Sequence, residues 1–154
     1  MNKYFFTTLF VKQNRYHKHS VLVHTLKVVL GVIATSKDKL FTAAWLHDIG
    51  NPLVATLDEN GKEFSFTNHE EKSYQIIKNW PFISKYTKDI VRYHYIRRRI
   101  EKDSKKLSEG KASANGDPIT KESVEEMIKL YNSFSFEFKK DLRIFQILDD
   151  NAKL

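Results

Sequence analysis

The chain has 154 residues, of which 41% are hydrophobic and 13% aromatic, and its formal net charge is +7. This length predicts a single domain with a real core, and this composition argues against wholesale disorder. Because the chain has no cysteine, disulfides and thiolate zinc sites are excluded, and a metal would need histidine, carboxylate and water ligands. The positive charge favours anionic partners such as nucleotides or RNA ends, although a solvated lysine-rich surface carries the same charge.

The N-terminal segment is apolar but short. No apolar run approaches the ~20 residues that a membrane-spanning helix needs. Residues 4–11 follow Lys3 as in a signal peptide, but they run into the polar residues 12–15 without a small-residue cleavage site. We therefore predict a first helix over about residues 3–12 that packs on the core, no membrane partner, and a cytoplasmic protein.

The second predicted helix carries a histidine within its apolar face. Ser20 suits the N-cap position, and the helix extends to about Ala34. His24 lies in the apolar stripe between Val21 and Val28. A single histidine in such a position is more often a satisfied core residue than a metal ligand.

The third predicted helix ends in an adjacent histidine and aspartate. Ser36 would cap it, and His47 and Asp48 end its apolar run. Gly50 and Pro52 then form a helix-stop signal. A carboxylate beside a buried segment costs free energy unless it is paired, and imidazole nitrogen with carboxylate oxygen suits a divalent cation. Alone, the pair is equally consistent with a polar cap on a helix end.

The sequence in the middle of the chain predicts a turn between two helices. Residues 53–66 lack a helical period, and Asn60-Gly61 between two short apolar runs predicts a β-hairpin, or only an ordered loop. A fourth helix begins at His69 and stops before Pro81. A fifth begins near Ser84, carries His94 and extends to about residue 100.

The C-terminal third contains the low-complexity stretch. Residues 103–118 are rich in lysine, serine, glycine and alanine, and they predict a flexible loop or lid. A sixth helix follows, and a last helix over residues 136–153 carries Asp149 and Asp150 near its end. The chain is therefore predicted to be a single domain over residues 1–154, an all-α bundle of about six to seven helices.

Four polar residues in or beside apolar stripes are explained together if they share one cation, which relieves several desolvation costs at once. They are His24, His47, Asp48 and Asp149. In this order they resemble the HD superfamily of metal-dependent phosphohydrolases. Its members are helical bundles in which a histidine, a His-Asp pair and a late aspartate bind a divalent cation.

A narrower resemblance lies in four stretches, which look like the HD domain attached to bacterial CCA-adding tRNA nucleotidyltransferases. They are Val-His-Thr-Leu-Lys-Val at 23–28, Ala-Ala-Trp-Leu-His-Asp-Ile-Gly-Asn-Pro at 43–52, Phe-Thr-Asn-His-Glu at 66–70 and Val-Arg-Tyr-His at 91–94. The resemblance covers about residues 15–100, and the last helix weakly. Because the chain has no nucleotidyltransferase head, we expect a stand-alone HD domain and not a CCA-adding enzyme.

The resemblance implies a divalent metal ion, which Mn, Mg, Ni, Co, Fe or Zn would satisfy, bound by His24, His47, Asp48 and an aspartate of the last helix. For that aspartate we prefer Asp149, because it shares the core face with Phe145 and Ala152, and Asp150 points further round the helix.

Catalytic roles are predicted for Asp48, His69 and His94. Asp48 would bind metal and orient the attacking water. The two histidines would hold a second metal, donate to phosphate or protonate the leaving oxygen, or else only cap helices. Arg97, three residues after His94, is the predicted phosphate clamp, and the next two arginines are predicted to be solvated.

The predicted activity is hydrolysis of a phosphoester of a nucleotide or RNA terminus, of the phosphomonoesterase or 2′,3′-cyclic phosphodiesterase type. Other HD proteins suggest a nucleotidase or nucleoside triphosphatase as the alternative. The family usually has lysine at the position of Asn51, where it can meet a phosphate. This departure leaves a third reading, a nucleotide- or RNA-binding module with a degenerate site.

Overall fold

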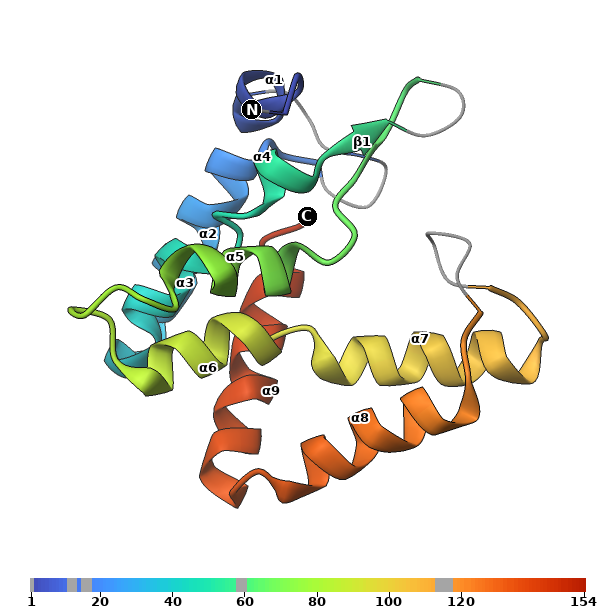
Figure 1. Cartoon of the computed structure of the whole chain (residues 1–154). Helices are drawn as coiled ribbons and strands as arrows, with labels where there is room; N and C mark the ends of the chain where they lie inside the picture. The colour runs from blue at the N-terminus through green and yellow to red at the C-terminus, as the bar shows by residue number, and fades with distance from the viewer. Residues whose placement is uncertain (1, 11–13, 15–17, 58–60, 113–117) are drawn as a thin grey trace.

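The computed structural model describes residues 2–10, 14, 18–57, 61–112 and 118–154, and it shows a helical bundle with one small hairpin (Figure 1). The helices are α1 (Phe5–Phe10), α2 (Val21–Ala34), the 3-10 helix η1 (Asp38–Leu40), α3 (Phe41–Leu46), α4 (Asn51–Val54), α5 (His69–Ile77), α6 (Lys85–Tyr93), α7 (Ile96–Ser108), α8 (Lys121–Ser133) and α9 (Phe136–Asn151). The fold-class prediction is confirmed. None of the helices in the described parts of the chain is both long and apolar enough to cross a membrane.

Helix α2 illustrates how the sequence builds the core. The Ser20 side chain accepts a hydrogen bond from the Val23 backbone N–H and so caps the helix. Val28 and Val32 recur on one face and are inaccessible to solvent, and His24 lies on this same buried face. The opposite wall of the core comes from α3, α6 and α9, which supply Ala44, Ile90 and Phe145 among its buried side chains.

The predicted hairpin is present. Strand β1 (Thr56–Leu57) pairs antiparallel with β2 (Phe64–Ser65), with Thr56 opposite Ser65. Most of the predicted turn, residues 58–60, lies outside the described residues. Gly61 has a φ of +65°, a left-handed conformation that glycine adopts without steric cost.

The first helix forms and contacts α2 and α4, but two of its large apolar side chains remain exposed. Phe6 and Phe10 are 64% and 69% exposed, whereas Thr8 is fully buried. The Thr8 hydroxyl lies 3.1 Å from the carbonyl oxygens of Tyr4 and Phe5, and donation to these acceptors makes its burial tolerable.

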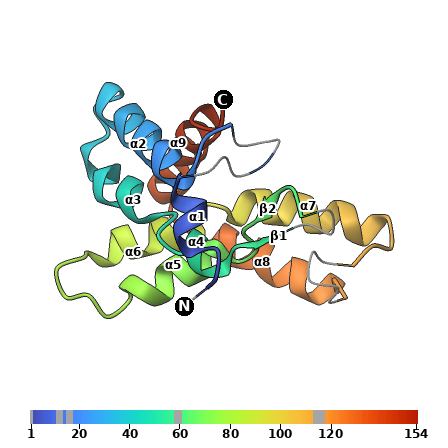
Figure 2. The ribbon, with the colours of Figure 1, turned by 90° about the horizontal axis from the view of Figure 1, so that it is seen from above.

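The predicted fifth helix is in fact two helices. Helix α6 ends at Tyr93, with His94 as its C-cap, and α7 begins only at Ile96. From this break α7 leaves the bundle and packs along α8, and both helices run outward on one side (Figure 1 and Figure 2). His94 and Arg97 therefore do not share one continuous helix, so the spacing that linked them in sequence does not hold.

Helix α7 also extends into the predicted loop. Residues 103–108 are helical, a correction to the predicted loop at 103–118, because lysine and leucine favour helix and α8 offers a packing surface. The helix ends where Gly110 takes a φ of +66° and the Lys111 N–H donates to the Lys106 carbonyl. Residues 113–117 of the predicted loop lie outside the described residues.

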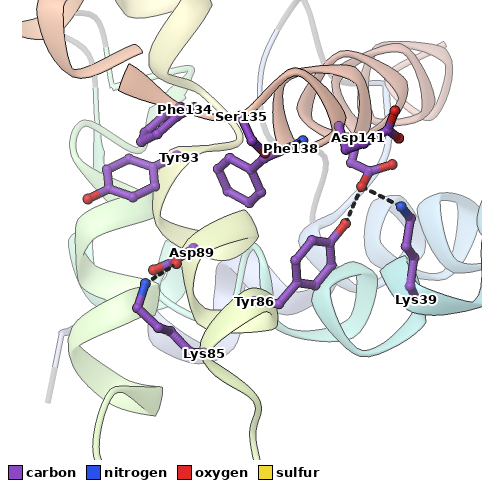
Figure 3. A pocket seen from close by; sticks show the side chains of 10 residues that line it. Lys39, Lys85, Tyr86, Asp89, Tyr93, Phe134, Ser135, Phe138 and Asp141 are labelled. Atoms are coloured by element: carbon purple, nitrogen blue, oxygen red, sulfur yellow. Dashed lines mark hydrogen bonds and ion pairs between the residues drawn. The ribbon is translucent and has the colours of Figure 1, made fainter. Parts of the chain in front are cut away.

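A buried carboxylate ties three elements of the bundle together (Figure 3). Asp141 of α9 is only 3% exposed, and it accepts a hydrogen bond from the Tyr86 hydroxyl of α6 at 2.6 Å. Lys39 of η1 forms an ion pair with the same oxygen at 2.6 Å. Burial and the Asp141 carboxylate both raise the pKa of Tyr86, so the phenol stays protonated. These side chains line a cavity of about 560 Å3 whose other wall is aromatic.

We predict that Asp141→Ala lowers the free energy of unfolding by about 2 kcal/mol, because it leaves a phenol and an ammonium without their shared acceptor. Asp89→Ala is the matched control, since Asp89 pairs with the exposed Lys85, and this substitution should change the free energy of unfolding by less than about 0.5 kcal/mol. Urea unfolding measures both. Equal losses for the two variants would contradict the role given to Asp141.

Candidate metal centre

The predicted metal ligands and catalytic residues lie together in the interior. They come from the first half of α2, the end of α3, the start of α5, the end of α6 and the last turns of α9, and they are His24, His47, Asp48, His69, His94 and Asp149. Five of these six side chains are buried, and His69 is 16% exposed. Five separate segments thus converge on one polar centre inside an apolar bundle.

The six side chains form two groups of possible metal ligands. His24, His47 and Asp149 make the first group, in which the His24 Nε2 lies 2.9 Å from Asp149 Oδ1 and 3.4 Å from His47 Nε2. Asp48, His69 and His94 make the second, in which the two imidazole Nε2 atoms are 3.3 Å apart. In each group the ligand atoms lie within 4.8 Å of one another.

Asp48 faces both groups. Its Oδ2 is 3.5 Å from His24 Nε2 and 3.4 Å from His47 Nε2. Its Oδ1 is 3.5 Å from His69 Nε2. The carboxylate therefore has the position that a bridging ligand between two cations would need.

The backbone fixes which ring nitrogen of each histidine points inward. Three imidazoles approach, through Nδ1, the carbonyl oxygen three residues earlier at 2.8–2.9 Å: His47 with Ala44, His69 with Phe66 and His94 with Val91. Because a carbonyl oxygen only accepts, each Nδ1 must carry a proton, and each Nε2 faces the centre.

This arrangement is chemically unbalanced without a cation. If both imidazoles were neutral, the Nε2 atoms of His69 and His94, 3.3 Å apart, would point two lone pairs at each other. Such a contact is stable only if a proton or a metal ion lies between the atoms. Imidazole nitrogens and carboxylate oxygens are ligands of divalent transition metals, so the residues present suit a divalent cation.

The pKa values show how the centre balances its charge in the absence of metal. Burial lowers the pKa of His47, but the carboxylates of Asp48 and Asp149 outweigh it and raise this pKa to about 10. Burial and the neighbouring imidazoles of His69 and His47 lower the pKa of His94 to about 4. Although burial opposes it, the histidine partners hold the pKa of both carboxyls well below the usual range.

Gly50 lets α5 approach the centre. Its N–H donates to the buried Ser73 hydroxyl at 2.9 Å. A Cβ at this position would lie 2.6 Å from the Ser73 backbone nitrogen and 2.8 Å from the His69 carbonyl oxygen. Both are backbone atoms that cannot move aside alone, so a glycine here allows His69 to reach Asp48.

A cavity of about 730 Å3 opens onto the centre and is bounded by β2 and α7. Asp48, His69 and Asp149 lie in its lining. Its basic lining residues are Arg98, Arg99, Lys102, Lys106 and Lys153. Once the carboxylates are neutralised by a cation, this lining favours a phosphate-bearing ligand.

The arginines that line the cavity are not the one that the sequence predicted as a phosphate ligand. Arg97 is not in the cavity lining and pairs with Glu101 of its own helix at 3.2 Å. Arg98 and Arg99, predicted as solvated, do line the cavity. Helical phase could not have shown this, because the unforeseen break after His94 rotates α7 relative to α6.

Two further residues belong to the centre, and only Lys153 had no signal in the sequence. Lys153 lies 2.6 Å from Asp149 Oδ2 and supports the ionised carboxylate. Asn51 lines the cavity at 3% exposure, and its Oδ1 has no hydrogen-bond partner in the described part of the chain. A buried amide oxygen without a partner is costly, which suggests a role toward a ligand.

A protein-family model, the HD domain, matches residues 16–146, so the chain belongs to this family. The class is that of metal-dependent phosphohydrolases, which bind divalent metal ions, and the grouped histidines and aspartates agree with it. No curated protein matches the chain. The family match confirms the superfamily and leaves the narrower likeness to CCA-adding enzymes as a prediction.

We predict that metal binding at pH 7 releases about one proton from His47. In the metal-free protein its pKa of about 10 keeps His47 protonated. The raised pKa of His47 contributes its full stabilisation to the metal-free fold at pH values below about 6.5, which is the pKa of this group in the unfolded chain. This contribution is lost as the pH rises through about 10. Metal affinity should therefore increase with pH up to that value.

Calorimetry in two buffers of different ionisation enthalpy measures the proton release. His47→Gln should abolish it, whereas His19→Gln should not, since His19 contacts Lys27 outside the centre. Identical heats in both buffers for the unmodified protein would show that no proton is displaced.

Proposed function

We propose that the chain hydrolyses a phosphoester at a nucleotide or RNA terminus, as a phosphomonoesterase or 2′,3′-cyclic phosphodiesterase. The observation that carries the proposal is the placement of Asp48, which faces both histidine groups and also lines the basic cavity. The likeness to the HD domain of CCA-adding enzymes supports the choice of nucleotide or RNA end.

In this proposal, His24, His47, Asp48 and Asp149 would hold one divalent cation. His69 and His94 would hold a second cation, to which Asp48 would also contribute. A bound divalent cation supplies a water that is nucleophilic at neutral pH and neutralises charge on the phosphoryl group. The inward Nε2 atoms and the ionised carboxylates are already arranged as ligands, so little reorganisation is needed on binding.

Asp48, His69 and His94 also act on the substrate side. Asp48 faces both groups of ligands and would orient the attacking water by accepting its hydrogen bond. His69 is the most exposed imidazole of the six ligands and lines the cavity, so it contacts the phosphate or, as the alternative to a second cation, protonates the leaving oxygen. His94 is buried behind it, and the pKa of about 4 keeps its Nε2 available as an acceptor.

Asn51 supports the alternative of a binding module. It places a neutral amide in the cavity where the family usually has a lysine. Loss of that cation weakens phosphate binding at this position, but five other basic side chains line the cavity. Their presence favours a working phosphohydrolase, with nucleotidase or nucleoside triphosphatase activity as the alternative within enzymes.

We predict metal-dependent turnover that disappears in His47→Ala and Asp48→Ala variants, because each removes an inward ligand. The assay is a panel of divalent metals against phosphomonoesters, 2′,3′-cyclic nucleotides and nucleoside triphosphates, with circular dichroism to confirm that the variants fold. Turnover that survives both substitutions would refute the site. Tight nucleotide binding without any turnover would support the binding module.

A matched pair of variants tests which arginine binds phosphate. Arg97 and Arg99 have side chains that are each 45% exposed, and each pairs with an acidic residue four positions later, but only Arg99 lines the cavity. Arg99→Gln should raise KM about tenfold with little change in kcat, and Arg97→Gln should leave KM unchanged. The reverse result would restore the phosphate clamp predicted from the sequence, Arg97.

A further inference from the structure

We propose that the cavity takes the end of a single-stranded oligonucleotide, with α7 binding the phosphates of nucleotides beyond the reacting one. This inference rests on the proposed function for the reacting end. It concerns a separate surface, the α7 track, which we define as Lys102 and Lys106 together with the cavity wall between them.

The spacing of the basic side chains is the first observation. Arg98 and Arg99 lie on one turn of α7, Lys102 on the next and Lys106 on the one after, and all four line the same cavity. Arg98 and Lys106 are separated by roughly 12 Å along the helix axis. A mononucleotide carries its phosphates in one cluster at one end. Cations distributed over two helical turns instead match phosphates of successive nucleotides.

The charge balance is the second observation. Five basic and five acidic side chains line the cavity, but Asp48 and Asp149 belong to the metal centre. Arg98 pairs with Asp150, and Arg99 pairs with Glu70 and Asp103.

The two lysines of the track differ from these arginines. Neither Lys102 nor Lys106 forms an ion pair with any residue that the structure describes, although Lys102 Nζ lies 2.5 Å from the Tyr95 hydroxyl. Their charges thus remain available to an anion. They follow Arg98 and Arg99 along α7, which runs outward from the bundle (Figure 1), so we assign them to phosphates beyond the reacting one.

Aromatic side chains in the same cavity are the third observation. Tyr95 precedes α7, and Phe66 follows β2, so they line the cavity from two different elements. Both are partly exposed. A basic groove with aromatic faces is the general design by which proteins bind single strands, with phosphates on the cations and bases stacked on the rings. This chemistry serves RNA and DNA alike.

The test is fluorescence anisotropy of RNA and DNA oligonucleotides of two, four and eight nucleotides that end in a 3′-hydroxyl, so that binding is measured without a terminal phosphate to remove. Affinity should rise about tenfold from two to four nucleotides in both series and then level off. The double variant Lys102→Gln/Lys106→Gln should bind the tetramer with about tenfold lower affinity. The slope of log K against log salt concentration should become less steep by about 1.4.

Lys105→Gln is the matched control, since Lys105 lies on the same helix but outside the cavity lining and is paired with Glu109. It should bind the tetramer as the unmodified protein does. Affinity independent of length, an equal loss in Lys105→Gln, or equally tight binding of a duplex would overturn the inference.

The two proposals fail separately in these experiments. Turnover of mononucleotide phosphoesters without any length dependence would refute only the α7 track. Length-dependent binding in a protein that hydrolyses no phosphoester would refute only the proposed hydrolysis.

Discussion

The structure depends on one buried carboxylate. Asp48 is 6% exposed, and its two oxygens face different pairs of imidazoles, His24 with His47 on one side and His69 with His94 near the other. A charge in this position costs several kcal/mol unless cationic or hydrogen-bonding partners surround it. These partners come from segments far apart in the chain, so α2, α3, α5 and α6 must all reach their final places to surround Asp48.

Helix ends and backbone carbonyls give the centre its orientation. His47 and His94 follow the last residues of their helices and His69 begins one, so each ring meets a carbonyl three residues earlier. Phe145 packs on the rings of His47 and His94 at centroid distances of 5.4 and 5.9 Å. An apolar wall thus holds the rings, and a polar backbone selects their tautomers. The chemistry is preorganised because neither constraint depends on a mobile side chain.

Much of the candidate site could be predicted from the sequence, because local sequence patterns place its residues. The His-Asp pair sits before a Gly and Pro stop signal, and His24 and Asp149 fall on apolar faces of regular helices, so period alone places them inward. The break after His94 could not be read, since no glycine or proline marks it and packing of α7 on α8 decides it. The same helix phase is the reason why the sequence favours Arg97, whereas Arg99 lines the cavity in the structure. Composition also misled at residues 103–108, where lysine and serine form helix because a neighbouring helix supports them.

Electron paramagnetic resonance of the protein loaded with Mn2+ tests the bridging role of Asp48 most directly, together with a count of bound ions. A carboxylate shared between two groups predicts two ions per chain with an exchange-coupled spectrum, and Asp48→Asn should lose that coupling. A single uncoupled ion, or two ions whose spectrum does not change in Asp48→Asn, would contradict a shared centre.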